Sequence, residues 1–179
     1  MPIGIGLLGL GTVGAGVAEI LLSPQGRHPL VADLELRQVA VRDLNRPRPI
    51  PLSNSLLTTD PAAVVANPDV DLVVEVMGGL EPARSLILAA IEAGKAVVTA
   101  NKAVIARHGA EIASAAAGAV SVKPSMVLLL RVLVVDTLSR SRKSHIGVPF
   151  IFIIFFFIVV EQNALFRTRF TRANISRWN

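Results

Sequence analysis

The sequence predicts an α/β fold in which an open parallel sheet carries helices on both faces. Short apolar runs alternate along residues 1–118 with stretches in which apolar residues recur at helical spacing. The runs are continuous, as expected for strands buried on both faces of a parallel sheet. The first run ends in three glycines, Gly9, Gly11 and Gly14, which join it to a helical stretch. Alternation of strand and helix predicts βαβ units and therefore parallel strands.

The elements of the first half follow from apolar patterns and turn residues. We expect a strand at residues 3–8 and then a helix whose apolar residues recur at helical spacing, Val13, Val17, Ile20 and Leu21. Residues 34–41 and the shorter run 56–59 are the next strand candidates. The pair Asp60-Pro61 is a helix start, which predicts a brief helix that continues to residue 66.

The second half repeats this pattern. Residues 72–76 are an apolar run that ends at Gly78 and Gly79, and residues 81–93 carry apolar side chains on one helical face before Gly94. Residues 96–99 predict another buried strand. A helix from about residue 109 to 117 then ends at Gly118.

Gly9, Gly11 and Gly14 have the spacing of a dinucleotide-binding turn. The first glycine permits a tight turn, the second lets the backbone approach a pyrophosphate, and the third lets the helix pack closely on the strand. The phosphates then lie at a helix N-terminus, which favours an anion. Three glycines can also be packing glycines at a crowded turn, but the order of strand, turn and helix favours a nicotinamide-cofactor site. The predicted fold is therefore a Rossmann-type doubly wound sheet.

Ligands of such sheets lie outside the carboxyl ends of the strands, so residues that directly follow strands are candidates for binding. Arg42 follows the second strand, with Asp43 beside it. An arginine there accommodates the 2′-phosphate of NADP, whereas an acidic residue binds the ribose 2′-hydroxyl of NAD. We expect NADP to be preferred and NAD to be usable. The alternative is that Arg42 only pairs with Asp43 on a solvated loop.

Two further groups follow strands at the same edge. Met77, Gly78 and Gly79 follow residues 72–76, where missing side chains would let the nicotinamide and its ribose approach the backbone. An ordinary strand exit explains these glycines equally well. Lys102 follows the strand at 96–99 and would hold a carbonyl, a hydroxyl or a phosphate in the cleft, or else cap exposed backbone carbonyls.

The chain consists of two compositions joined near Gly118. Residues 1–118 contain nine Lys or Arg and eleven Asp or Glu, whereas residues 119–179 contain nine and two, together with all seven Phe and the one Trp. Such a joint change marks a boundary. We expect a nucleotide-binding domain at 1–118 and a divergent basic and hydrophobic tail at 119–179, as a shifted reading frame, a truncation or a premature fusion would produce.

The tail leaves several alternatives. Residues 146–160 fit a membrane segment, an aggregation-prone buried strand or a stretch not selected to fold, and we favour the last. The arginines of the tail, with Phe166, Phe170 and Trp178, could bind nucleic acid. They form no known nucleic-acid-binding motif, so we expect no nucleic-acid partner. The chain has no cysteine and its three histidines lack metal-ligand spacing, which predicts no metal site. No secretory signal is visible, so we expect a cytoplasmic protein.

Four segments together resemble one family. They are Gly9-Leu10-Gly11-Thr12-Val13-Gly14, the strand end Val41-Arg42-Asp43, Asp71-Leu72-Val73-Val74-Glu75 followed by Met77-Gly78-Gly79, and Thr99-Ala100-Asn101-Lys102-Ala103. With these segments, residues 3–117 closely resemble the cofactor domain of homoserine dehydrogenase. Many oxidoreductases share the glycine turn, so the segments from Glu75 to Lys102 are the restrictive part.

The resemblance implies NADPH- or NADH-dependent reduction of L-aspartate 4-semialdehyde to L-homoserine, on the route to threonine, methionine and isoleucine. It also implies that Lys102 lies by the nicotinamide and the reacting centre, where an ammonium stabilises a developing alkoxide. An oligomer is compatible with the full-length family. We expect Lys102 to be the catalytic residue and the cofactor site to comprise Gly9, Leu10, Gly11, Thr12, Val13, Gly14, Arg42, Met77, Gly78, Gly79 and Lys102.

Beyond residue 117 the sequence departs from the family. Members continue into a substrate domain that supplies homoserine-binding carboxylates and a second lysine for proton transfer, and residues 119–179 match none of these. The expected function is therefore an oxidoreductase of the homoserine dehydrogenase type that lacks its substrate domain. The alternative is a non-catalytic nucleotide-binding module, with or without a membrane tether at residues 146–160.

Overall fold

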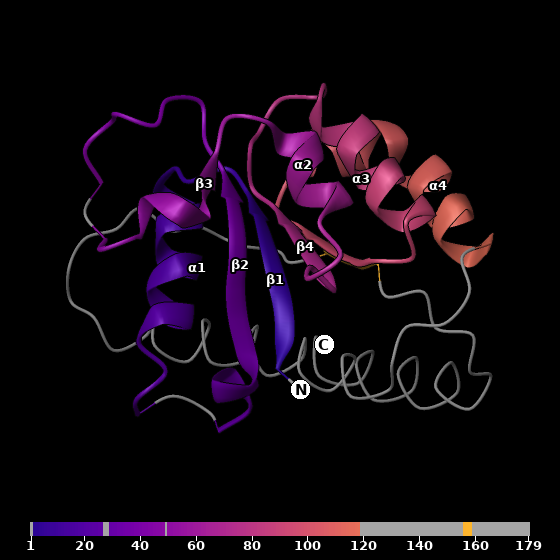
Figure 1. The fold of residues 1–179 in the computed structure, drawn as a ribbon. Coiled ribbons are helices and arrows are strands. Elements are labelled where there is room, and N and C mark those ends of the chain that lie inside the picture. Colours follow the sequence, from indigo (N-terminus) through magenta and orange to yellow (C-terminus); the bar gives the residue numbers. More distant parts are fainter. Residues whose placement is uncertain (1, 27–28, 49, 119–155, 159–179) are drawn as a thin grey trace, which may run out of the picture.

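The computed structural model describes residues 2–26, 29–48, 50–118 and 156–158 (Figure 1). Strands and helices alternate along the chain, with two short 3-10 helices at Pro29–Asp33 and Asn54–Leu56. The elements are β1 (Ile3–Leu8), α1 (Thr12–Leu22), β2 (Leu34–Ala40), β3 (Leu57–Thr58), α2 (Pro61–Ala66), β4 (Leu72–Glu75), α3 (Ala83–Glu92), β5 (Ala96–Thr99), α4 (Lys102–Gly118) and β6 (Phe156–Ile158).

The strands form one sheet in the order β3-β2-β1-β4-β5-β6. β1 to β5 pair in parallel, and β6 pairs antiparallel with β5. The chain builds the sheet outward from β1 in one direction to β3 and then in the other direction from β4. The strand order therefore reverses between β1 and β4, which is where sheets of this class bind ligands at their carboxyl edge. The predicted doubly wound parallel sheet is confirmed.

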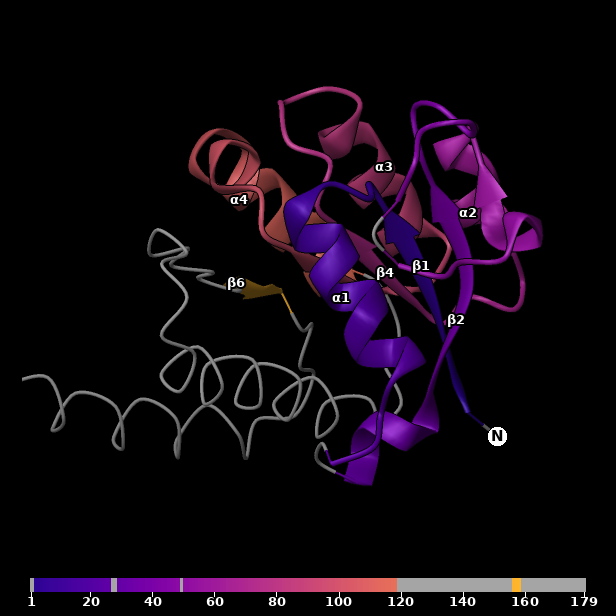
Figure 2. The ribbon, with the colours of Figure 1, turned by 90° about the vertical axis from the view of Figure 1, so that its left-hand side faces the viewer.

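Helices cover both faces of the sheet (Figures 1 and 2). Leu72 and Val74 of β4 belong to the apolar core that includes α1, whereas Val73 belongs to the core that includes α2, α3 and α4. Both faces of the central strands are thus buried. This double burial explains why these strands appear in the sequence as continuous apolar runs.

Helix α4 begins earlier than the sequence pattern predicts. It starts at Lys102 rather than near Gly109, because the Asn101 side-chain oxygen accepts the Val104 N–H at 3.2 Å and caps the first turn. Val104 and Ile112 are buried in the apolar core that also contains residues of α3 and of the sheet. Tertiary packing therefore outweighs the unfavourable helix propensity of Gly109.

The other predicted boundaries lie within two residues of the observed ones. Asp60 is the N-cap of α2, since its side chain accepts the Ala62 N–H at 2.9 Å, and Pro61 is the first helical residue. Of residues 146–160, only Phe156–Ile158 are described, as strand β6. The other residues of that segment, like most of the predicted tail, lie outside the described part of the chain.

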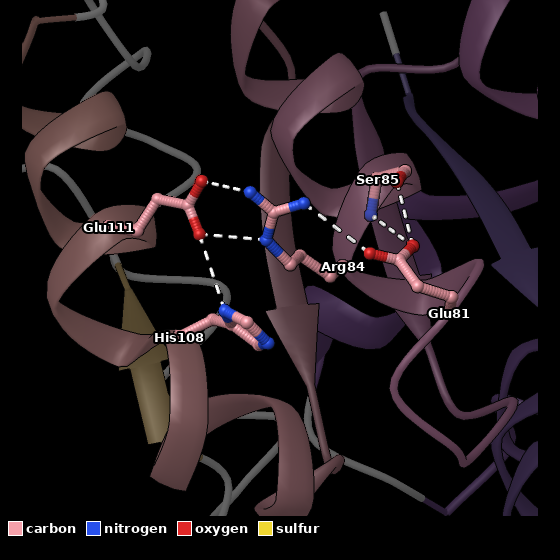
Figure 3. A network of polar contacts seen from close by, with 5 residues as sticks. All are labelled: Glu81, Arg84, Ser85, His108 and Glu111. Carbon is pink, nitrogen blue, oxygen red and sulfur yellow. Dashed lines mark hydrogen bonds and ion pairs between the residues drawn. The ribbon is translucent and has the colours of Figure 1, made fainter.

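An exposed polar network joins α3 to α4 (Figure 3). Arg84 donates to both carboxylate oxygens of Glu111, with Nε to Oε2 at 2.7 Å, and its Nη1 lies 3.4 Å from Glu81 Oε1. The pKa of Glu111 is lowered by its hydrogen bond with Arg84, and that of Glu81 chiefly by its hydrogen bond from the Ser85 hydroxyl. Both carboxylates are therefore ionised at physiological pH, where the network with Arg84 persists.

Candidate functional site

The carboxyl ends of four parallel strands are held side by side by backbone hydrogen bonds. The Gly9 N–H donates to the Ala40 carbonyl at 3.0 Å, which joins the turn after β1 to the end of β2. The Val76 N–H donates to the Leu8 carbonyl at 2.9 Å, and the Ala100 N–H donates to that of Glu75 at 3.2 Å. The turn at Gly9, the strand exit at Arg42, the Met77–Gly79 turn and the start of α4 therefore lie at the same edge of the sheet, as predicted.

Each of the three glycines in the turn after β1 meets a different requirement. Gly9 has a φ of +101°, which L side chains rarely adopt. A Cβ on Gly14 would lie 2.2 Å from the Gly9 carbonyl oxygen, so α1 packs on the turn at a distance that only glycine permits. A Cβ on Gly11 would meet nothing within 4 Å. The backbone at Gly11 therefore faces open space, as the approach of a pyrophosphate requires.

The N-terminus of α1 has the properties of an anion site. Gly11 is the N-cap and supplies no side-chain hydrogen bond, and the first turn contains no acidic residue. The first N–H groups of a helix lack intrahelical acceptors and carry the positive end of its dipole. Thr12 is exposed there, and Leu10 packs against the core on the α1 side. These observations fit a dinucleotide phosphate at Gly11, Thr12 and Val13.

Arg42 lies where β2 leaves the sheet. Val41 is buried, and its N–H donates to the Thr58 carbonyl at 2.8 Å, whereas Arg42 is exposed. The Asp43 carboxylate accepts the Asn45 N–H at 2.9 Å, and within the described residues Arg42 forms no ion pair with it. The alternative in which Arg42 only neutralises Asp43 is therefore not what the structure contains.

The loop after Arg42 is organised by a second arginine. Arg48 donates to three backbone carbonyls of the loop, those of Asp43, Leu44 at 3.0 Å and Arg46 at 2.9 Å. Its guanidinium is thereby occupied within its own loop. Arg42, at the strand end, has no such contacts among the described residues, so its side chain can meet an anion there.

The turn after β4 contains two consecutive glycines in the left-handed region. Gly78 has a φ of +75° and Gly79 one of +77°, so both positions favour glycine. Both are exposed, and Met77 before them is half-buried. The Met77 N–H donates at 2.8 Å to the carboxylate of Glu75, which is 0 % exposed.

Lys102 is the first residue of α4 and is exposed. Within the described chain its ammonium has no hydrogen-bond or ion-pair partner, so capping of backbone carbonyls does not explain its position. A cation at a helix N-terminus is unfavourable because it adds to the positive end of the dipole. The ammonium and the positive end of the helix dipole together favour a negatively charged group at this position.

The buried residues Glu75, Thr99 and Asn101 are the part of the site that the sequence analysis did not single out as functional. Glu75 and Thr99 are paired in register between β4 and β5, and Thr99 Oγ1 donates to Glu75 Oε2 at 2.5 Å. A charged residue at the end of an otherwise apolar strand was the available signal. Among the described residues, no group of three His, Asp or Glu side chains could hold a metal ion.

Comparison with known proteins gives consistent results. The family model described as "Homoserine dehydrogenase, NAD binding domain" matches residues 9–121. A homoserine dehydrogenase of Synechocystis sp. is 60% identical over 116 residues, which are 65% of this chain and 27% of that protein. One of Corynebacterium glutamicum is 47% identical over 119 residues, 65% of this chain and 26% of that protein.

Solved structures give the same pattern of similarity. The crystal structure of a homoserine dehydrogenase from Thiobacillus denitrificans has a TM-score of 0.55 and 42% identity. The match covers 65% of this chain and 27% of that one. The chain thus spans about a quarter of the length of the relatives that it matches.

Proposed function

This chain belongs to the family of homoserine dehydrogenase NAD-binding domains, and from that membership we propose that it provides the cofactor site for hydride transfer between a nicotinamide dinucleotide and a small carbonyl substrate. The substrate pair that we propose is L-aspartate 4-semialdehyde and L-homoserine. The observation that carries the proposal is the turn from Gly9 to Gly14, where an open backbone at Gly11 lies at an uncompensated helix N-terminus.

The proposed cofactor residues form one line along the carboxyl edge of the sheet. The N–H groups at Gly11, Thr12 and Val13 would bind the pyrophosphate, and the Gly78-Gly79 backbone would lie beside the nicotinamide end. When bound, the reduced nicotinamide supplies a hydride. The exposed ammonium of Lys102 would bind the carbonyl oxygen of the substrate and stabilise the negative charge that develops on it.

The proposed reaction is tested with the 179-residue chain and both reduced cofactors. Calorimetry measures whether NADPH and NADH bind, and the loss of reduced-nicotinamide absorbance on addition of aspartate semialdehyde measures turnover. Binding with turnover that Lys102→Met lowers by about a hundredfold or more would support the full proposal. Binding without turnover would support a nucleotide-binding module, and absence of binding would overturn both.

We also propose that NADP is preferred over NAD and that Arg42 sets this preference. Arg42→Ala is expected to weaken NADPH binding by about 10- to 100-fold, because a charge-assisted hydrogen bond contributes about 1.5–3 kcal/mol. NADH, which lacks the 2′-phosphate, is expected to lose less than about threefold. Calorimetric titration with each cofactor measures the difference.

Arg46→Ala is the matched control for this experiment, since Arg46 is exposed on the same loop but lies farther from the strand end. Equal losses of NADPH and NADH affinity in Arg42→Ala would show that Arg42 does not bind the 2′-phosphate.

We also propose a cytoplasmic location and a small-molecule substrate. In the described part of the chain no helix is long and apolar enough to cross a membrane.

A further inference from the structure

Among the residues that the structure describes, no cation pairs with the buried side chain of Glu75. It is 0 % exposed, and its described partners are the Met77 N–H on Oε1 at 2.8 Å and the Thr99 hydroxyl on Oε2 at 2.5 Å. Burial of a charge is costly unless hydrogen bonds compensate it, and apolar residues fill a core more favourably. A group of this kind at the end of β4 therefore calls for an explanation other than stability.

The hydrogen bonds of Glu75 continue into the turn after β5. Thr99 Oγ1 accepts the Asn101 N–H at 3.0 Å. The Asn101 side chain donates from Nδ2 to the Gly79 carbonyl at 2.7 Å and accepts the Val104 N–H on Oδ1 at 3.2 Å. The bonds thus form a closed ring that runs from Glu75 through Thr99 and Asn101 to the Met77–Gly79 turn and back to Glu75.

This ring joins two pieces of the site that are far apart in sequence. One side of it is the turn with the two left-handed glycines, and the other side is the capped first turn of α4, which begins with Lys102. None of the hydrogen bonds in the ring involves Lys102 itself or Arg42. The ring can therefore set the place of Lys102 relative to the glycine turn while leaving the lysine ammonium available.

We propose that Glu75, Thr99 and Asn101 are positioning residues, whose hydrogen-bonded ring holds the Gly78-Gly79 backbone and the start of α4 in the arrangement that receives the nicotinamide end of the dinucleotide. The proposal rests on the proposed function. The adenosine end of the cofactor would lie outside the hydrogen-bonded ring, because Arg42 follows β2, which is on the other side of β1 from β4 and β5. Disruption of the ring should therefore affect only one end of the ligand.

Two ligands distinguish binding of the nicotinamide end of the cofactor from binding of its adenosine end. NADPH contains the nicotinamide, and 2′-phospho-ADP-ribose is the same molecule without it. In the 179-residue chain, Thr99→Val removes the hydroxyl with little change in shape and leaves Glu75 Oε2 and the Asn101 N–H unpaired. We expect it to weaken NADPH binding by about tenfold and to reduce the fluorescence gain of the bound nicotinamide, since one buried hydrogen bond is worth about that factor. Binding of 2′-phospho-ADP-ribose should change by less than about twofold.

Two further variants keep the test decisive. Thr99→Ser retains the hydroxyl and should restore the NADPH affinity and the fluorescence gain. Asn101→Ser keeps a capping oxygen for α4 but loses the donor to Gly79, and it should show the same selective loss as Thr99→Val. If thermal unfolding shows that Thr99→Val is not folded, Asn101→Ser tests the proposal in its place.

The outcomes distinguish this proposal from the function on which it rests. Equal loss of both ligands, or no loss of either, in folded Thr99→Val and Asn101→Ser would overturn the positioning role and assign the ring to stability alone. Failure of the unmodified chain to bind NADPH would instead overturn the proposed function. Binding of 2′-phospho-ADP-ribose by the unmodified chain would show that the site for the adenosine end is functional. This binding is the reference for the two variants.

Discussion

Gly11→Val is expected to abolish binding of NADPH and NADH while the fold is retained. A Cβ at Gly11 meets no atom within 4 Å, so the free protein accommodates the larger side chain. The same side chain would occupy the space in front of the α1 N-terminus, where the phosphates have to approach the N–H groups. We expect affinity to fall by at least about a hundredfold, because two or more charge-assisted hydrogen bonds of about 1.5–3 kcal/mol each would be lost.

Calorimetric titration and thermal unfolding of the same samples measure the two effects separately. Replacement of an N-cap glycine by valine should cost about 1 kcal/mol of stability and no more. Gly16→Val is the matched control, since Gly16 lies in the same helix and a Cβ there also meets nothing within 4 Å. Undiminished NADPH binding by Gly11→Val would show that the phosphates lie elsewhere.

Gly14→Ala is expected to destabilise the fold itself. Its Cβ would lie 2.2 Å from the Gly9 carbonyl oxygen and 3.3 Å from Val76 Cγ2. The first obstacle is backbone in a tight turn whose Gly9 has a φ of +101°, so it has little freedom to move. Overpacking costs about 1–3 kcal/mol or more. A contact of 2.2 Å with backbone belongs at the upper end of that range, so we expect the cost to exceed the gain of about 1 kcal/mol that alanine brings to a helix interior.

Urea unfolding of Gly14→Ala beside Gly16→Ala measures this effect. The two variants place the same methyl group two residues apart in α1, and only the methyl group at position 14 meets the turn. Gly16→Ala should gain up to about 1 kcal/mol from helix propensity, whereas Gly14→Ala should show a net loss. If both variants were equally stabilised, α1 would not pack on the turn as closely as the structure has it.

The parts of the fold that could be predicted are those that depend on neighbours in sequence. β1 and β5 have the predicted bounds, and Asp60-Pro61 begins α2 as expected. The predicted start of α4 near Gly109 is wrong by seven residues, since the helix begins at Lys102. The helix passes through Gly109 because Asn101 caps it and buried residues on both sides of that glycine anchor it.

The candidate site was likewise predictable only in part from the sequence. The glycine turn and the strand exits at Arg42 and Lys102 could be located from sequence, because their positions follow from the order of strand, turn and helix. The preference for NADP and the role of Lys102 remain proposals. The structure adds that Arg48 is hydrogen-bonded within its own loop and that Arg42 is not paired with Asp43 in the described residues.

The sequence by itself determined the alternation of strands and helices and the glycine spacing at the end of β1, because periodicity and turn chemistry act over a few residues. Only the tertiary structure decided that Glu75 and Thr99 face each other and that Asn101 reaches the Gly79 carbonyl. These contacts join residues 22 or more apart and depend on the parallel register of β4 and β5. No local pattern encodes that register, because it results from packing of the whole sheet between its helices.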